Sequence, residues 1–359
     1  MKVDLGSLFG KKSTPLVGLD ISTSSVKVVE LAEAGKNDVR LVRCAMEPLP
    51  KGAVVDGNIE NIDQVAEAVR KLWKKSGVGS KFVALGLPSA SVITKQITLP
   101  GSLHEDELEI QVESEASQYI PFALDEVSLD FDVMGRASNS DGDEIEVMLA
   151  AARKEKVEDR VAVAEAAGLT PTVMDIETYA ARAALDRITA RVPQASGKII
   201  ALFHIGSAVT HVSVLLDGKV LYEREQPFGG KQLTQDIVRA YGMTQEEAEN
   251  CKRSGALPQG YEAEVLAPFL ENASLEITRA IQFFFTSTPY TRIDHLFLSG
   301  GGATVPGLAD AVATRAAVPT SVISPFQGMQ LSTGIKENQL GLEGPAYLVA
   351  CGLAMRRFD

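Results

Sequence analysis

The sequence predicts an α/β protein built from two structurally similar halves. In two segments a buried strand runs into a short hairpin of small residues and then into a second strand. These segments are residues 17–27 (VGLDISTSSVK) and residues 201–210 (ALFHIGSAVT). A third segment, residues 296–307, is a buried strand that breaks into a glycine turn before a helix. The repeated strand–hairpin–strand pattern indicates that one structural unit is present twice.

The residue types in these three segments favour the binding of a nucleotide. Small residues let backbone N–H groups approach an anion closely, and two such hairpins facing each other can hold phosphates from both sides. Oriented amides at the start of a helix suit an anion, or a nucleotide lying flat on the backbone. The sequence contains no GxxxxGKS or GxxxxGKT motif, which excludes a P-loop, and no GxGxxG after a strand, which argues against dinucleotide binding.

The composition excludes several classes of protein. A net charge of −12 over 359 residues argues against nucleic-acid binding, which needs a basic surface. The three cysteines lack CxxC spacing and the four histidines form no HExxH motif, so we expect free buried thiols and no structural metal. No stretch reaches the roughly 18 apolar residues of a membrane span. The N-terminus is not typical of a signal peptide, so we expect a cytosolic protein.

The first half begins with three strands, which we expect within residues 16–46 around the first hairpin. Apolar residues at helical spacing predict an amphipathic helix over residues 61–75. Another strand is predicted at residues 82–85. We assign residues 1–86 to the first part of lobe 1.

Residues 87–155 follow a different pattern and predict a small inserted α/β subdomain. Strands are expected at residues 92–99, 127–133 and 145–152. Between the first two strands, a helix is expected to end at Pro121, because proline removes a backbone donor.

Residues 156–195 are expected to complete lobe 1. Helices over residues 156–167 and 176–191 flank a strand at residues 172–175. The second helix is rich in small side chains, as a helix must be where it crosses close to another. Residues 192–197 form the clearest linker of the chain.

Lobe 2 is assigned to residues 196–343, where the strand–hairpin–strand pattern restarts. It contains the second hairpin, a helical insert over residues 230–290 and the glycine turn. A final helix within residues 344–359 repeats the small-residue pattern. We expect this helix to pack back on lobe 1.

The order of hairpin, small-residue helix, hairpin, glycine turn and small-residue helix resembles the actin-like ATPase superfamily. Within it the chain resembles the PilM family of type IV pilus assembly. The likeness is carried by residues 18–31 (GLDISTSSVKVVEL), 97–100 (ITLP), 113–122 (ESEASQYIPF), 127–131 (VSLDF), 149–155 (LAAARKE) and 167–169 (AGL). The fold that the resemblance implies is actin-like, a duplicated ribonuclease H-like fold of two lobes that bind a nucleotide, with a small inserted α/β subdomain.

The resemblance also implies a role. Members of this family are ATP-binding scaffolds at the cytoplasmic face of the inner membrane, with at most slow ATPase activity expected here. They grip the short N-terminal cytoplasmic tail of the membrane protein PilN in a groove beside the inserted subdomain. Through it they connect to the pilus motor ATPases or the platform protein. Membrane contact is then expected through the partner, and ATP with Mg²⁺ is the expected ligand.

The first hairpin supplies the expected phosphate and metal contacts. Asp20 follows a hydrophobic strand, where a Mg²⁺ ion held through water would stabilise its carboxylate, and turn capping is the alternative. Lys27 is placed to reach the phosphates as a point charge, or is otherwise a solvated strand lysine. Amides and hydroxyls for the β- and γ-phosphates are expected from Ser22, Thr23, Ser24 and Ser25.

In the second hairpin, phosphate contacts are expected from Gly206, Ser207 and Thr210. His204 stands where the superfamily usually has an aspartate that orders magnesium-bound water and the attacking water. Because histidine is a poor Mg²⁺ partner, ATP binding is compatible with this change, whereas fast hydrolysis is in question. The adenosine is expected to lie against the glycine turn formed by Gly300, Gly301 and Gly302.

Three further residues take roles from the resemblance. Glu177 stands where heat-shock chaperones carry an acid that positions water, which implies a catalytic role, with helix capping as the alternative. Residues 248–252 (AENCK) are similar to the AExxK motif of the family. There Glu249 would accept from the ribose hydroxyls and Lys252 would flank the adenine; an ordinary charged pair is the alternative.

Two other functions stay open at this point. A filament-forming division protein like FtsA would carry a membrane-binding helix beyond the last crossing helix, and this chain stops at residues 356–359. A small-molecule kinase would need a carboxylate base and an acceptor pocket, which no segment indicates. Leu5, Leu8 and Phe9 share a helical face near the N-terminus, but bury too little apolar area to anchor the chain alone.

Overall fold

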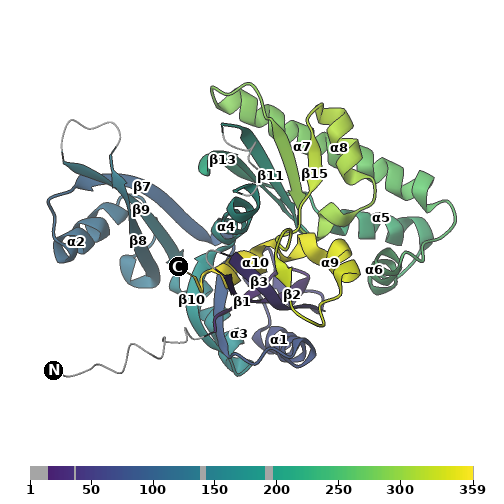
Figure 1. Cartoon of the computed structure of the whole chain (residues 1–359), viewed down its shortest axis with the longest axis horizontal. Helices are drawn as coiled ribbons and strands as arrows, with labels where there is room; N and C mark the ends of the chain where they lie inside the picture. The colour runs from purple at the N-terminus through teal and green to yellow at the C-terminus, as the bar shows by residue number, and fades with distance from the viewer. Residues whose placement is uncertain (1–14, 36–37, 138–142, 191–196, 359) are drawn as a thin grey trace.

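The computed structural model describes residues 15–35, 38–137, 143–190 and 197–358. Two larger β-sheets form two lobes, and a three-stranded sheet extends to one side of them (Figure 1). The expectations for Leu5, Leu8 and Phe9 lie outside the described residues, as does the predicted linker except for Gly197.

The sheet of the first lobe has the order β10-β6-β1-β2-β3-β16. Strands β1 and β2 pair antiparallel around the first hairpin, whereas β6 runs parallel to β1. Its strands are β1 (Val17–Ile21), β2 (Ser25–Gly35), β3 (Asp38–Pro48), β6 (Phe82–Leu87), β10 (Thr170–Ile176) and β16 (Gln330–Leu331). A separate two-stranded hairpin is formed by β4 (Val54–Val55) and β5 (Asn58–Ile59).

The sheet of the second lobe has the order β13-β12-β11-β14-β15. Its strands are β11 (Ile199–Ile205), β12 (Thr210–Leu216), β13 (Lys219–Gln226), β14 (His295–Ser299) and β15 (Thr320–Val322). Here β11 pairs antiparallel with β12 and parallel with β14, as β1 does with β2 and β6. The order β3-β2-β1-β6-β10 is therefore repeated strand for strand, which confirms the prediction of two similar halves.

The third sheet has the order β7-β9-β8 and belongs to the inserted subdomain. Its strands are β7 (Val92–Pro100), β8 (Val127–Arg136) and β9 (Glu144–Arg153). One face packs on helix α2 (Glu105–Ala116) through a core that includes Ile97, Val112 and Val147. Apolar residues alternate along these strands because only one face of the sheet is covered.

Most remaining helices lie where apolar periodicity predicts them. Helix α1 begins after Asn61, whose Oδ1 accepts from the N–H of Gln64 at 2.9 Å, and ends at Gly77 in the left-handed conformation. The helices are α1 (Ile62–Ser76), α3 (Lys154–Ala166), α4 (Glu177–Thr189), α5 (Lys231–Tyr241), α6 (Gln245–Ser254), α7 (Ala267–Ser287), α8 (Leu308–Ala316), α9 (Glu337–Glu343) and α10 (Leu348–Met355). Short 3-10 turns lie at Ser89–Ser91 (η2), Leu124–Glu126 (η3), Gly301–Thr304 (η5) and Gly344–Tyr347 (η6), and a π turn at Glu262–Leu266 (η4).

Helices α4 and α10 cross between the two larger sheets (Figure 1). A Cβ on Gly352 of α10 would lie 1.8 Å from the Ala180 carbonyl oxygen of α4. A Cβ on Gly18 of β1 would lie 2.0 Å from the Ala350 carbonyl oxygen. The small residues read from the sequence are therefore required, because the helix backbones touch each other and the sheet. Among the described residues, no helix is long and apolar enough to cross a membrane.

The sequence analysis did not predict the shortest strands. Strands β4, β5 and β16 have two residues each, too few to show a period of two. Strand β16 joins the sheet of the first lobe although it lies late in the chain, where it runs parallel to β3. Such a pairing depends on tertiary contact, since no local pattern encodes it.

Candidate functional site

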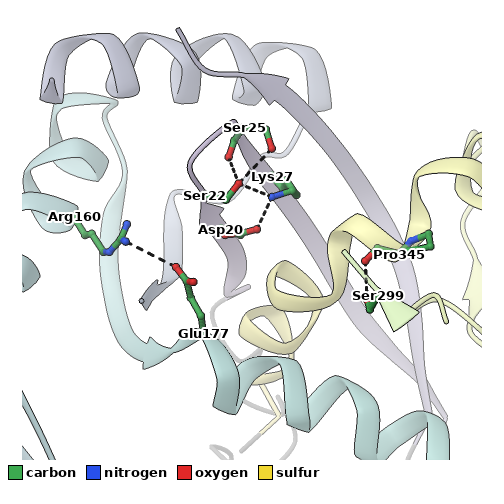
Figure 2. Close-up of polar contacts among 8 residues, drawn as sticks. All are labelled: Asp20, Ser22, Ser25, Lys27, Arg160, Glu177, Ser299 and Pro345. Atoms are coloured by element: carbon green, nitrogen blue, oxygen red, sulfur yellow. Dashed lines mark hydrogen bonds and ion pairs between the residues drawn. The ribbon is translucent and has the colours of Figure 1, made fainter. Parts of the chain in front are cut away.

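The first hairpin holds a buried ion pair. Asp20 and Lys27 face each other across β1 and β2, and Lys27 Nζ lies 2.7 Å from Asp20 Oδ2 (Figure 2). Their side chains are only 5% and 9% exposed. Lys27 also donates to Ser22 Oγ at 2.9 Å, and Ser22 Oγ donates to the carbonyl of Ser25 at 2.8 Å. An unpaired charge at this depth would be costly, so the pairing of the two side chains compensates for their burial.

The other residues of this hairpin differ in exposure. Ser25 is buried, Thr23 is partly buried and Ser24 is exposed at the tip. The turn is closed by the N–H of Ser22, which donates to the carbonyl of Ser25 at 3.0 Å. The structure therefore brings the predicted phosphate residues into one tight turn beside a lysine.

The second hairpin is fixed to the start of α5. The N–H of Gly206 donates to the carbonyl of Val209 at 2.9 Å, and the carbonyl of Ser207 accepts from the N–H of Lys231 at 2.8 Å. Thr210 is 2% exposed, and its hydroxyl donates to the carbonyl of Phe228 at 2.7 Å. The hydroxyl proton of Thr210 is therefore engaged in a hydrogen bond within the second lobe. Gly206 and Ser207, in contrast, lie in the turn of the hairpin.

The glycine turn packs against the end of β11, just before the second hairpin. A Cβ on Gly300 would lie 2.4 Å from the Ile205 carbonyl oxygen, and a Cβ on Gly302 would lie 2.3 Å from Ile205 Cγ2. Gly301 is exposed, and a Cβ there would meet nothing within 4 Å. Two of the three glycines are therefore required by packing, and Gly301 alone faces open space.

The C-terminal part of the chain holds this turn in place. The carbonyl of Pro345 accepts from Ser299 Oγ at 2.9 Å (Figure 2) and from the N–H of Gly300 at 2.8 Å. Both bonds link β14 of the second lobe to η6, which leads directly into the crossing helix α10.

Glu177 is the first residue of α4 and lies among charges from both lobes. Burial raises the pKa of Glu177 to about 7, Arg160 and Lys27 oppose that rise, and Asp20 and Glu225 add to it. Arg160 Nη2 lies 3.8 Å from Glu177 Oε1 (Figure 2). Because Glu225 belongs to β13 and Asp20 to β1, the two sheets come close to each other at Glu177.

His204 occupies the end of β11, opposite His211 on β12. Burial, with His211 and Lys27, lowers the pKa of His204 to about 3, so the imidazole is neutral. Its Nδ1 is buried without a hydrogen-bond partner. Because Lys27 acts on His204 from the other lobe, the two hairpins lie near each other. We call Asp20, Lys27, Glu177 and His204 the inter-lobe site.

Glu249 and Lys252 form a separate network between α5 and α6. Lys252 Nζ lies 2.7 Å from Glu249 Oε2, and both contact Thr234 Oγ1 at 2.8 Å. Burial alone would raise the pKa of Glu249, but Lys252, Thr234 and Arg253 outweigh it and hold this pKa below its ordinary value. These contacts are those of the charged-pair alternative, and the ribose contact of Glu249 stays a prediction.

The oxygen donors near the first hairpin limit which kind of metal ion fits there. Asp20 uses one carboxylate oxygen for Lys27, and no group of three or more His, Cys, Asp or Glu residues in the described part of the chain could hold a metal ion. A Mg²⁺ ion bound through water and carried mainly by phosphate oxygens needs only such a single carboxylate. The residues present therefore fit a nucleotide-borne ion better than a resident one.

Sequence reasoning missed Arg160. It is 2% exposed and lies on α3 beside the core residues Val163 and Ala164. A lone arginine in an amphipathic helix gives no signal of burial, because arginines are usually exposed. A surface cavity of about 560 Å³ between α7 and α8 contains none of the predicted site residues.

Fold and site define a two-lobed α/β protein of the actin-like class, with charged residues of both lobes near its two small-residue hairpins. A family profile described as type IV pilus assembly protein PilM matches residues 18–358. The chain belongs to this family, and both the resemblance and the actin-like fold predicted from the sequence are confirmed.

Solved structures agree with this assignment. A chain of a PilM–PilN type IV pilus biogenesis complex superposes with a TM-score of 0.80 at 28% identity, covering 97% of this chain and 99% of that one. The ethanolamine utilization protein EutJ from Carboxydothermus hydrogenoformans shares the fold, with a TM-score of 0.54 at 16% identity over 94% of this chain and 88% of that one.

Among curated proteins the similarity is to cell division protein FtsA. The protein from Bacillus subtilis (strain 168) is 24% identical over 383 residues, covering 94% of this chain and 82% of that protein. The protein from Enterococcus faecalis is 38% identical over 80 residues, which are 22% of this chain and 18% of that protein.

Proposed function

We propose that the chain is an ATP-binding scaffold of the type IV pilus inner-membrane assembly machinery, which binds the N-terminal cytoplasmic tail of PilN. The observation that carries the proposal is the match over nearly the full length of both chains to a protein of a PilM–PilN complex. The nearness of Lys27 in the first hairpin to the neutral His204 of the other lobe supports the nucleotide part.

In this proposal Lys27 and the first hairpin hold the phosphates from one lobe. Gly206 and Ser207 present backbone groups from the other lobe. The adenosine lies against the open face of Gly301, with Glu249 and Lys252 as the contacts to ribose and adenine. Asp20 would hold Mg²⁺ through water by its remaining oxygen, and the ion would neutralise phosphate charge.

Hydrolysis is proposed to be slow. Glu177 is the carboxylate that would orient a water molecule or accept its proton as a general base, and its raised pKa suits such a role. His204 supplies no second carboxylate, because it is a neutral imidazole. The site thus has phosphate contacts but only one of the two carboxylates expected for fast hydrolysis. Such a site suits a protein in which bound ATP stabilises one conformation.

The scaffold would act at the cytoplasmic face of the inner membrane, held there by PilN. It would link PilN to the pilus motor ATPases or to the platform protein. ATP favours one arrangement of the lobes, and a partner that prefers this arrangement then binds more tightly.

Isothermal titration of the purified chain with Mg-ATP and with a synthetic PilN-tail peptide tests the proposal. We expect both to bind, and Gly301→Val to weaken ATP binding at least about tenfold, because its side chain would occupy the open face of the glycine turn. Gly79→Val is the matched control, since Gly79 is also exposed with nothing within 4 Å. A peptide that fails to bind in every nucleotide state would refute the scaffold role.

An FtsA-like filament protein is the second candidate, favoured by the 24% identity to FtsA over 94% of the chain. ATP-dependent sedimentation of long filaments, together with no affinity for the PilN peptide, would reverse the ranking.

A further inference from the structure

The inserted subdomain joins the first lobe through two segments that meet at one place. On the entry side, η2 precedes β7 directly. On the exit side, β9 ends at Arg153 and α3 begins at Lys154, so no loop separates the inserted sheet from α3. A cavity of about 10 Å³ is lined by residues of both segments and of the β4–β5 hairpin, which shows that the three pack together.

The exit segment reaches the inter-lobe site through Arg160. Its Nη2 donates to the carbonyl of Gly57 at 3.1 Å and lies 3.8 Å from Glu177 Oε1. Its Nη1 is buried without a partner. A buried guanidinium needs compensation, so Glu177 and the Gly57 carbonyl together fix where Arg160 can lie. Conversely, the ion pair with Arg160 limits the positions that the carboxylate of Glu177 can take.

The entry segment touches the same turn of α4. Ser89 Oγ donates to Thr178 Oγ1 at 3.0 Å, and Thr178 follows Glu177 directly. Both connections of the inserted subdomain therefore contact the first turn of α4. Glu177 in turn lies among Arg160 of α3, Asp20 and Lys27 of the first hairpin, and Glu225 of β13.

We propose that Arg160 and Ser89 are positioning residues that couple the inserted subdomain to the first turn of α4, so that a partner bound beside the subdomain changes the affinity of the inter-lobe site for nucleotide. The inference rests on the proposed function and names the residues through which partner binding would regulate nucleotide binding. A shift of the inserted sheet moves α3 with it, because no flexible loop intervenes. The distance between Arg160 and Glu177 then changes, and with it the electrostatic potential at the position of the phosphates. By linkage, nucleotide changes the affinity for the partner by the same factor.

The test measures the ATP dissociation constant with and without saturating PilN-tail peptide. We expect a coupling factor of about tenfold in the unmodified chain, within the usual range for allosteric pairs. Arg160→Met should bring the factor close to one, and Arg160→Lys, which keeps a cation beside Glu177, should lie between. Arg315→Met is the control, because Arg315 bonds to Ser274 in the second lobe.

A double-mutant cycle separates positioning from general damage. If Arg160 acts through Glu177, Arg160→Met has no further effect on ATP affinity in a Glu177→Gln background. Should Arg160→Met fail to fold, Ser89→Ala removes one half-buried hydrogen bond and should lower the coupling factor about twofold or more, whereas Ser321→Ala, which removes the bond to His295, should not.

Wild-type coupling retained in folded Arg160→Met and Ser89→Ala, or additive effects in the cycle, would overturn the proposal. A chain that binds ATP and peptide without any coupling would also overturn it, and would leave the proposed function intact. A chain that binds neither would contradict the proposed function itself.

Discussion

At the scale of single residues, Lys27 and Asp20 have linked effects on stability and on ligand binding. Lys27→Met leaves the carboxylate of Asp20 buried without its partner, so we expect a loss of about 3–5 kcal/mol in the free energy of unfolding. Urea denaturation followed by circular dichroism measures this loss. ATP affinity should fall at the same time, because the cation of the first hairpin is gone.

The control is the double variant Asp20→Asn/Lys27→Met, which contains no buried charge at this position. It should regain most of the stability without regaining ATP affinity. A double variant as unstable as Lys27→Met would show that the pair is held by packing and that its charges contribute little.

Glu177 makes stability depend on pH. Its pKa in the folded chain, about 7, lies above the ordinary value of 4.5, so the folded state holds the proton more tightly. The stabilisation is full below about pH 4.5 and is lost as the pH rises to about 7. Relative to the unmodified chain, Glu177→Gln should therefore gain stability between about pH 5 and about pH 8.

Urea titrations of both proteins at the two pH values check this, since other groups cancel in the difference. Glu165→Gln, an exposed position of α3, serves as the control and should show no gain. Equal pH profiles for the Glu177 variant and the unmodified chain would mean that Glu177 is solvated in solution.

At the scale of elements, the crossing of α4 and α10 ties the lobes together. Gly352→Ala would place a Cβ 1.8 Å from the backbone oxygen of Ala180, which cannot move without shifting a helix. We expect a loss of about 3 kcal/mol in the free energy of unfolding, measured by urea denaturation. Gly341→Ala in α9 meets nothing within 4 Å and should be neutral, or stabilising by up to about 1 kcal/mol.

At the scale of the whole molecule, charge is segregated. Residues 92–153 contain fourteen acidic and three basic side chains, so eleven of the twelve net negative charges lie in the inserted subdomain. Helix α2 has six acidic residues and no basic one. Like charges gathered in one subdomain repel one another, and salt largely screens this repulsion between charges farther apart than the Debye length, which is about 10 Å at 0.1 M.

Raising NaCl from about 20 mM to about 300 mM should therefore slow hydrogen exchange of the β7, β8 and β9 amides. Amides of β11 and β14 in the second lobe provide the internal comparison and should change less. A uniform response across both sets would contradict a local electrostatic cause.

The sequence by itself determined the repeated strand–hairpin–strand units, the presence of the main helices and the small-residue character of the two crossing helices. These depend on local rules, such as the run of buried residues in β1 and the spacing of apolar residues in α1. The sequence analysis assigned all three glycines of the turn to the adenosine, whereas the structure requires Gly300 and Gly302 for packing against Ile205. The resemblance of the chain to a known family came from such local sequence segments.

Only the tertiary structure decided which partners these residues meet. Lys27 was expected to point at phosphates and is bonded to Asp20, and the hydroxyl of Thr210 is used by Phe228. Arg160 became a site residue only because α3 buries it beside Glu177. Periodicity fixes which face of an element is apolar, but the pairing of buried charges depends on how distant segments pack, and no local pattern records it.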